Sequence, residues 1–288
     1  MNASSERVKT QRAIFILASV MLFAILFVTH CPSVTTEPED AVVETALTEG
    51  VVTSGSDTES DSDADTEPPA PKPLTEEEKD AFWDESVFIG DSVTLGLRNY
   101  VVGQRNKGAK CLSGAQFLAV GNMGYMNSLS EIGARNSYHP KFQGKEVTIE
   151  EGVRLTGAKR VFIMLGMNDF CAYPTETGIE GAKEVVNRIL NKCPDADIYI
   201  ESVTPGLYDR KKFNNENINI FDDALKKMCE ENGWTYVDVA SVMKDADGKL
   251  KKEYCSDPEA EGVHMSSDGC VAWIGYLNEF ITYGGKNQ

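Results

Sequence analysis

The sequence predicts an α/β domain with a doubly wound parallel sheet, and three observations support this fold class. Short apolar runs that are rich in β-branched residues alternate with longer stretches of helical character. The runs are apolar throughout, as strands buried on both faces are. Polar residues follow the ends of two runs, where open α/β sheets bind their ligands. Together these observations favour a three-layer, flavodoxin-like domain with helices on both faces of the sheet.

The elements expected of this domain can be placed in chain order. Four apolar runs predict strands at residues 86–90, 160–165, 197–203 and 235–239. A fifth, weaker strand is expected near residues 109–112. Helix-like stretches lie at residues 148–156, 181–193, 215–232 and 266–283. Because helices separate the strands, we expect the strands to be parallel and joined by βαβ crossovers.

The N-terminal segment has the features of a membrane anchor. Residues 13–29 form an uninterrupted apolar run, close to the shortest length that spans a membrane as a helix. Basic residues precede the run and acidic residues follow it, which favours a cytoplasmic N-terminus. We therefore expect residues 1–30 to hold a cytoplasmic segment and an uncleaved single-pass anchor in the cell membrane, with the remainder extracellular. A cleaved signal peptide and a lipid-modified Cys31 are the alternatives.

The segment after the expected anchor is strongly acidic. Residues 31–80 are dominated by Ser, Thr, Pro and acidic residues, with 15 acidic and 2 basic side chains, and carry about −13 of the formal net charge of −17. Such a segment cannot bury enough apolar surface to offset its ordering entropy, so we expect a disordered, extended tether. The folded domain is then expected at residues 81–288, where no basic patch suggests a nucleic-acid partner.

The cysteines and histidines limit the chemistry that the domain can support. Seven cysteines include no CxxC pair, which argues against a zinc ribbon or a thioredoxin-like site. A disulfide between Cys255 and Cys270 is one expectation, and burial of the thiols as small apolar groups is the other. Of three histidines, His30 belongs to the membrane segment and His139 precedes a proline in a polar stretch, which leaves His264 as the candidate base. One such histidine does not make a metal site, so neither a metal nor a cofactor is expected.

Two further polar residues stand at positions that suit catalysis. Ser92 follows the first strand at the start of a helix, where free N–H groups and the helix dipole favour negative charge. Simple helix capping is the alternative. Asn168 follows the strand at residues 160–165 and can point its amide at an oxyanion, or act as an ordinary turn residue.

Four sequence blocks carry a resemblance to a known family. The blocks are GDSV at residues 90–93, a glycine in LAVGNMGYMN, GMND at residues 166–169 and ExxH at residues 261–264. In this order they resemble the four blocks of the SGNH hydrolases, also called the GDSL family. The resemblance extends over about residues 83–283, and the stretch AKRVFIMLGMNDF also looks like extracellular members from Gram-positive anaerobes. It implies the SGNH hydrolase fold, with a five-stranded sheet, and a serine-dependent carboxylic ester hydrolase.

The resemblance also implies a role for each matching residue. Ser92 is expected to be the nucleophile and to offer its own N–H to the oxyanion, with His264 as the general base. Gly121 is expected to supply the second oxyanion donor, with Gly124 as the alternative. The side-chain amide of Asn168 is expected to supply the third donor.

The third member of the triad departs from the family pattern. Family members usually carry Asp three residues before the histidine, and that position here is Glu261. Glu261 is therefore expected to orient His264, and Asp257 is the competing candidate. The motif GDSVT also lacks the second glycine of a G-x-S-x-G elbow, which argues against an ordinary α/β-hydrolase.

The expected location narrows the substrate. An anchored extracellular domain meets wall glycans, teichoic acids and polysaccharides that carry O-acetyl groups, and no long apolar lid suggests a lipase. We therefore expect a serine esterase that removes acyl groups, acetyl first, from an extracellular carbohydrate or cell-wall substrate. A lysophospholipase or thioesterase, and an O-acyltransferase with the same site, are the alternatives. A non-catalytic flavodoxin-like binding domain is a further alternative, but it would leave the three strand-end residues without a role.

Overall fold

The computed structural model describes residues 72–283 of the chain. The expected membrane anchor, at residues 13–29, and most of the expected acidic tether lie outside the described residues. Among the helices of residues 72–283, none is long and apolar enough to cross a membrane.

The centre of the domain is a five-stranded sheet with the order β2-β1-β5-β6-β7, in which every pair of neighbours is parallel. The fold class and the parallel sheet are therefore confirmed. The strands are β1 (Ser86–Gly90), β2 (Gln116–Ala119), β5 (Arg160–Met164), β6 (Asp197–Glu201) and β7 (Thr235–Val237). Four of them coincide with the predicted apolar runs, although three of these strands end before their runs do.

The strand predicted near residues 109–112 is wrong, because the strand at this place in the chain is β2, which begins at Gln116. Residues 109–115 instead form turns that the guanidinium of Arg105 holds in place. Arg105 donates hydrogen bonds to three carbonyl oxygens of this segment, those of Cys111, Leu112 and Ala115. Those carbonyls are thus used by a side chain and not by a neighbouring strand.

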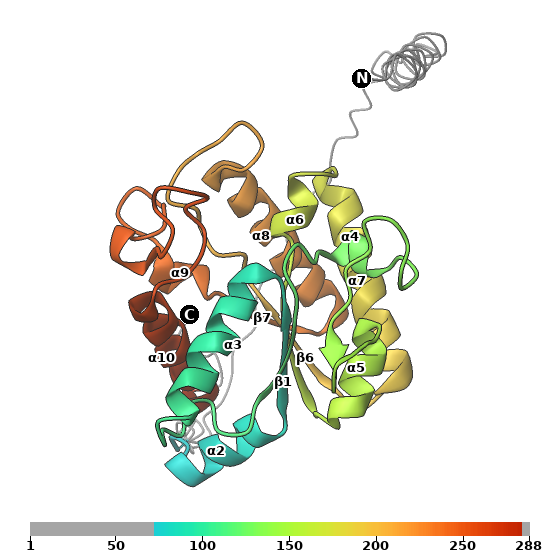
Figure 1. Ribbon diagram of the computed structural model, residues 1–288, viewed down its shortest axis with the longest axis vertical. Helices are drawn as coiled ribbons and strands as arrows, with labels where there is room; N and C mark the ends of the chain where they lie inside the picture. The colour runs from blue at the N-terminus through green and yellow to red at the C-terminus, as the bar shows by residue number, and fades with distance from the viewer. Residues whose placement is uncertain (1–71, 284–288) are drawn as a thin grey trace, which may run out of the picture. The chain divides into compact units, whose positions relative to one another are not determined.

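Helices cover both faces of the sheet, which gives the three layers seen in Figure 1. One face packs against α5 (Ile149–Thr156), α7 (Thr175–Lys192) and α8 (Asn215–Asn232). The other packs against α2 (Glu76–Asp84), α3 (Ser92–Arg105), α9 (Ala240–Met243) and α10 (Ser267–Tyr283). The remaining elements are short: α4 (Tyr125–Ser128), α6 (Met167–Phe170), the hairpin of β3 (Lys141–Phe142) and β4 (Lys145–Glu146), and a 3-10 helix at Lys252–Tyr254.

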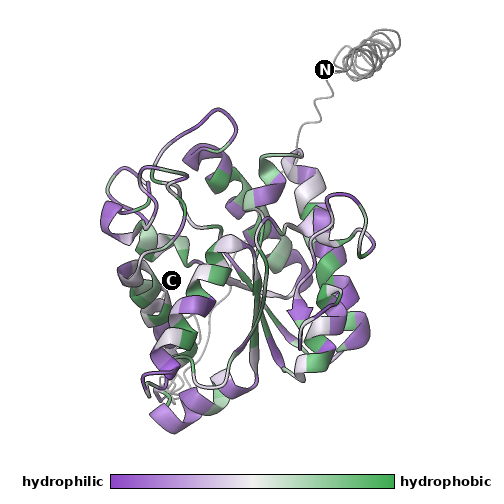
Figure 2. Ribbon diagram, viewed as in Figure 1, coloured by the Kyte–Doolittle hydropathy of each residue, from purple (hydrophilic) through white to green (hydrophobic). Residues whose placement is uncertain are grey.

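Successive residues of each central strand point into opposite apolar layers. The strands are coloured largely as hydrophobic in Figure 2. In β1, Val87 and Ile89 belong to the layer beneath α5, α7 and α8, whereas Phe88 belongs to the layer beneath α3 and α10. On that second face the rings of Phe117, Phe88, Phe162 and Tyr199 stack from strand to strand, with centroids 5.2, 5.0 and 4.4 Å apart. This burial explains why the runs read as continuously apolar.

The folded domain begins earlier than the sequence predicted. Helix α2 starts at Glu76, within the expected tether at residues 31–80, so the tether's boundary was placed too late. A capping box starts the helix: Thr75 accepts the N–H of Glu78 at 3.2 Å, and the Glu78 carboxylate accepts the N–H of Thr75 at 2.7 Å. The helix is anchored by Trp83, which is buried in the apolar layer beneath α10.

The disulfide considered between Cys255 and Cys270 is not formed. All six cysteines of residues 72–283 are free thiols. Cys255 and Cys270 are both buried in the apolar layer that contains Trp273, which agrees with the alternative that these thiols act as small apolar groups.

The strand order creates a topological switch point beside β1. The chain moves from β1 to β2 on one side and then returns to β5 on the other side. In such sheets the crevice beyond the carboxyl ends of the two central strands binds ligands. Gly90, the last residue of β1, pairs with Met164 of β5, so the segments that carry Ser92 and Asn168 leave the sheet side by side.

Candidate active site

Ser92 is the first residue of α3, directly after the turn that follows β1. The cap of this helix is Asp91, whose side chain accepts the N–H of Val93 at 2.9 Å. The hydroxyl of Ser92 is therefore not needed as a cap, and its Oγ lies 3.0 Å from Nε2 of His264. Because first-turn N–H groups have no partner inside a helix, the N–H of Ser92 is available to a bound group.

His264 lies between Ser92 and an acidic residue. Its Nδ1 is 2.8 Å from Oδ2 of Asp257. The other oxygen of Asp257 accepts the backbone N–H groups of Val263 and His264, at 3.1 and 3.0 Å. Burial alone would raise the pKa of Asp257, but hydrogen bonds from the side chain and backbone of His264 outweigh it and lower that pKa to about 2. Asp257 is thus held as a carboxylate that orients the imidazole.

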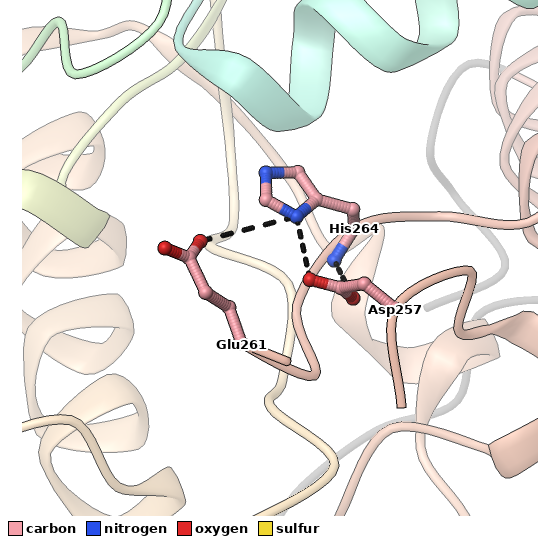
Figure 3. A group of neighbouring side chains, drawn as sticks. All are labelled: Asp257, Glu261 and His264. Carbon is pink, nitrogen blue, oxygen red and sulfur yellow. Dashed lines mark hydrogen bonds and ion pairs between the residues drawn. The ribbon is translucent and has the colours of Figure 1, made fainter. Parts of the chain in front are cut away.

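Glu261, which the sequence analysis expected in this position, is farther from the histidine. Its Oε2 is 3.9 Å from Nδ1 of His264, and its side chain is 68% exposed, against 19% for Asp257. Figure 3 shows both carboxylates approaching the same ring nitrogen from different directions. The hydrogen-bonded acid is therefore Asp257, seven residues before the histidine, and not Glu261.

A tight turn explains this geometry. The backbone carbonyl of Asp257 accepts the N–H groups of Ala260 and Gly262, at 2.9 and 3.2 Å. Gly262 has a φ of +72°, in the left-handed region that favours glycine. The chain thus folds back on itself between Asp257 and His264. The spacing of three residues in the sequence did not reveal this turn.

Asn168 is the second residue of α6, beyond the end of β5. Its Nδ2 donates to Oδ2 of Asp91 at 3.2 Å and to the carbonyl of Met123 at 3.0 Å. Burial raises the pKa of Asp91 to about 6, while its hydrogen bonds with the helix N-terminus act in the opposite direction. The amide therefore joins the turn after β1 to the segment after β2, and it borders the same cavity as Ser92.

The two glycines considered as oxyanion donors have different environments. The N–H of Gly124 donates to Oδ1 of Asn127 at 2.8 Å and is therefore already engaged. Gly121 has open space on the side where a Cβ would lie, so close packing does not require glycine there. The adjacent Asn122 has a φ of +63° and lines the cavity with Ser92. Asn122, the neighbour of Gly121, thus lines the serine's cavity, whereas neither of the two glycines does.

Asp169, which was not among the predicted site residues, holds the segment after β2 in place. Its buried carboxylate accepts the N–H groups of Tyr125 and Met126 at the start of α4, at 2.8 and 2.9 Å. A Cβ on Gly124 would lie 2.6 Å from Oδ2 of Asp169, so glycine is required for this approach. Burial raises the pKa of Asp169 to about 6, and the two backbone hydrogen bonds counteract that rise. The GMND block therefore joins β5 to the segment after β2, a contact between distant positions.

The cavity beside Ser92 has a volume of about 270 Å³. It is lined by residues at the start of α3, in α6 and in several loops: Ser92, Asn122, Met167, Asn168, Cys171, Arg210, Phe213, Glu261 and Val263. The guanidinium of Arg210 donates to the carbonyl of Ala260, which holds it at the cavity wall. Arg210 also borders a larger, more open hollow of about 700 Å³ near the N-terminus of α8, so the two hollows adjoin.

Comparison with known proteins agrees with this arrangement. The sequence profile of the GDSL-like lipase/acylhydrolase family matches residues 88–271, more than half of the chain. No curated protein matches the chain significantly. Among solved structures, an acylhydrolase-like protein of Bacteroides fragilis is similar at 19% identity, with a TM-score of 0.51 and coverage of 74% of this chain and 90% of the other.

Two further structures have the same fold. A GDSL-like lipase of Bacteroides thetaiotaomicron is 15% identical, with a TM-score of 0.51 and coverage of 69% of this chain and 88% of that one. A protein of the G-D-S-L family from Desulfitobacterium hafniense is 18% identical, with a TM-score of 0.50 and coverage of 67% and 97%. The structural likeness supports the fold, and the profile match supplies the family. The chain belongs to the GDSL-like lipase/acylhydrolase family, the SGNH hydrolases.

Proposed function

We propose that the protein is a serine esterase that removes acyl groups, acetyl first, from an extracellular carbohydrate or cell-wall substrate. The observation that carries this proposal is the chain of contacts from Ser92 Oγ to His264 Nε2, at 3.0 Å, and from His264 Nδ1 to Asp257, at 2.8 Å. This is the geometry that a hydroxyl needs to act as a nucleophile at neutral pH.

In the proposed reaction, Nε2 of His264 takes the proton of the Ser92 hydroxyl while Oγ attacks the ester carbonyl. The carboxylate of Asp257 accepts a hydrogen bond from Nδ1 and stabilises the positive charge that forms on the ring. The tetrahedral intermediate then expels the alcohol, which receives the proton from His264. Water then attacks the acyl-enzyme while His264 takes a proton from it. His264 returns this proton to the Ser92 oxygen, which releases the acid and free Ser92.

The oxyanion would be bound by groups that converge on the cavity. These are the N–H of Ser92 at the start of α3, the amide of Asn168, and a backbone N–H of the segment 121–122, with Gly121 retained as the first candidate. Both acceptors of the Asn168 amide are protein groups in the free enzyme. Its longer bond, to Asp91, is the one we expect to be exchanged for the oxyanion.

The cavity lining supports a carbohydrate ester over a lipid. The volume of about 270 Å³ is at the small end of ligand sites and suits a short acyl group. Asn122, Arg210 and Glu261 offer donors and acceptors for hydroxyl groups, and Phe213 offers an aromatic face. The adjoining hollow near α8 is lined mainly by polar and charged side chains, so a polymer has a polar surface on which to extend. A lysophospholipase or thioesterase would need an apolar groove for its acyl chain.

An active-site probe tests the nucleophile. A fluorophosphonate should label the full chain at Ser92, and Ser92→Ala should remove the label. Ser130→Ala, which changes an exposed serine of the loop after α4, should label as the unchanged protein does. Equal labelling of Ser92→Ala would exclude Ser92 as the nucleophile, and no labelling of any form would favour a binding domain.

A substrate series tests the acyl group and the acceptor. We expect p-nitrophenyl acetate to be hydrolysed faster than the octanoate, and acetate to be released from O-acetylated xylan or peptidoglycan. The reverse chain-length order would favour the lysophospholipase or thioesterase alternative. Transfer of the acetyl group to an added glycan in preference to water would favour the O-acyltransferase.

We also propose that residues 13–29 anchor the protein in the cell membrane, with the esterase domain outside. The support is the apolar run with its basic flank. Produced in a Gram-positive host, the full chain should sediment with membranes, and protease added to intact cells should release the esterase domain. A shortened protein in the medium without added protease would show a cleaved signal peptide instead.

A further inference from the structure

We propose that Asp257, Glu261 and His264 form a binding site for a zinc-like divalent metal ion, and that occupation of this site inhibits the esterase. The metal site stands on geometry alone, whereas the inhibition rests on the proposed function. The proposed hydrolysis uses no metal, so a metal bound at this site would regulate the enzyme and would not take part in the reaction.

The three side chains already converge on one point. Nδ1 of His264 is 2.8 Å from Asp257 and 3.9 Å from Glu261, and the three ligand atoms all lie within 4.8 Å of one another. Zinc bound at its usual distances of about 2.0–2.2 Å separates tetrahedral ligand atoms by about 3.3 Å. The observed separations lie on either side of that value. The largely exposed side chain of Glu261 can close the remaining gap by rotation (Figure 3).

The site is partly preorganised. One oxygen of Asp257 is held by the N–H groups of Val263 and His264, so the other oxygen points at Nδ1. Backbone hydrogen bonds to a ligating carboxylate are the usual support of a metal ligand. Glu261 makes no hydrogen bond to a residue of the described part of the chain that would compete with a metal. The Glu261 carboxylate beside Nδ1 is thus free to serve as the third ligand.

The ligand set favours zinc over the common hard cations. One imidazole and two carboxylates are ligand types that zinc binds in tetrahedral sites, with a fourth position left for water. Mg²⁺ and Ca²⁺ prefer six or more oxygen ligands and gain little from an imidazole. We therefore expect Zn²⁺ to bind, and Mg²⁺ and Ca²⁺ at the same concentration not to compete with it.

Metal binding would change the tautomer of the catalytic histidine. Because the Asp257 carboxylate can only accept a hydrogen bond, the tautomer that fits the free enzyme carries its proton on Nδ1, and the lone pair of Nε2 then faces the hydroxyl of Ser92. A metal takes the lone pair of Nδ1, so the single proton of the neutral ring must then lie on Nε2. The ring gains and loses no proton overall. An Nε2 that carries a proton cannot accept the one from Ser92, so the nucleophile is not activated.

Calorimetric titration with ZnCl₂ measures binding independently of activity. The full-length Ser92→Ala protein keeps all three ligands and should bind one zinc ion at this site. Adding Glu261→Gln should weaken that binding by about tenfold or more, because a ligand is lost. Adding Glu259→Gln, a change at an exposed carboxylate two residues away, should leave the affinity within about twofold. Equal affinities of the two variants, or no binding, would overturn the proposed site.

Activity measurements test the switch. Zinc should inhibit hydrolysis of p-nitrophenyl acetate, and excess EDTA should restore it. With each variant compared with its own zinc-free rate, Glu261→Gln should need about tenfold more zinc for half-inhibition than Glu259→Gln. Zinc binding that depends on Glu261 but leaves the rate unchanged would overturn the switch. A zinc-free enzyme with no esterase activity would contradict the proposed function and leave the binding result standing.

Discussion

The carboxylate of Asp257 contacts His264 twice, through Oδ2 to Nδ1 at 2.8 Å and through Oδ1 to the backbone N–H at 3.0 Å. The same acid therefore orients the ring and fixes the backbone that carries it. Glu261 makes neither hydrogen bond, although it stands at the position where the family pattern places the acid.

The first prediction compares the two acids. Asp257→Asn should lower kcat by about 10²-fold or more, because a neutral amide cannot stabilise the imidazolium and holds the wrong tautomer. In zinc-free buffer, Glu261→Gln should lower kcat by less than about tenfold, because its exposed carboxylate lies 3.9 Å from Nδ1 and makes no hydrogen bond to the ring. Steady-state kinetics in EDTA-treated buffer measures both. The opposite order would restore Glu261 as the orienting acid, and two small effects would identify a Ser92–His264 dyad.

The second prediction concerns Asn168. Asn168→Ala should lower kcat by about 10²–10³-fold with a much smaller change in KM, because an oxyanion donor acts mainly in the transition state. The amide also joins Asp91 to Met123, so folding must be measured alongside by circular dichroism. A loss of less than twofold in a fully folded variant would show that Asn168 is a turn residue.

The third prediction concerns Asp169, which we expect to position the segment 121–124. Asp169→Asn places an amide donor against the N–H of Tyr125 or Met126, and an unsatisfied buried donor costs about 1–3 kcal/mol. We therefore expect a loss of several degrees in Tm and a reduced kcat in the protein that remains folded. Asp195→Asn, at an exposed site in the turn before β6, should change neither. An unchanged Tm for Asp169→Asn would show that its two hydrogen bonds do not hold the segment.

The fourth prediction concerns stability and pH. Glu201 at the end of β6 is fully buried and accepts the indole N–H of Trp273 at 3.0 Å. Burial raises its pKa to about 8, and the Trp273 hydrogen bond only partly opposes this. Between about pH 4.5 and pH 8 the folded state therefore binds the Glu201 proton more strongly than the unfolded state does. The contribution of this group to the free energy of unfolding is fully present below about pH 4.5 and is lost as pH rises toward 8, by up to ~1.4 kcal/mol per pH unit.

Replacing Glu201 with Gln tests that sign. The amide imitates the protonated acid and still accepts from Trp273, so the Tm of Glu201→Gln should fall less than that of the unchanged protein between pH 5 and about pH 8. Thermal unfolding across this range measures the difference. Parallel Tm curves for the two proteins would mean that Glu201 ionises alike in the folded and unfolded states.

The fold and most residues of the candidate site could be predicted from short patterns in the sequence. Strands such as β1 and β5 are buried on both faces, so they are apolar at every position and stand out from helices. Ser92 and Asn168 directly follow such strands, and parallel strands bring their carboxyl ends to one edge of the sheet. The strand β2 was misplaced because the side chain of Arg105 binds carbonyls of the segment before it, and hydropathy patterns do not record such hydrogen bonds.

The sequence by itself determined the fold class, the family, and the serine, amide and histidine of the site, because each depends on short-range periodicity or on a contiguous motif. The tertiary structure decided which acid meets His264, since the turn closed by Gly262 folds Asp257 back to within 2.8 Å of Nδ1 and leaves Glu261 at 3.9 Å. It also decided the part played by Asp169, whose partners Tyr125 and Met126 are more than forty residues away in the chain. Hydrogen bonds of that kind depend on the direction of side chains in the folded state, and residue spacing carries no record of it.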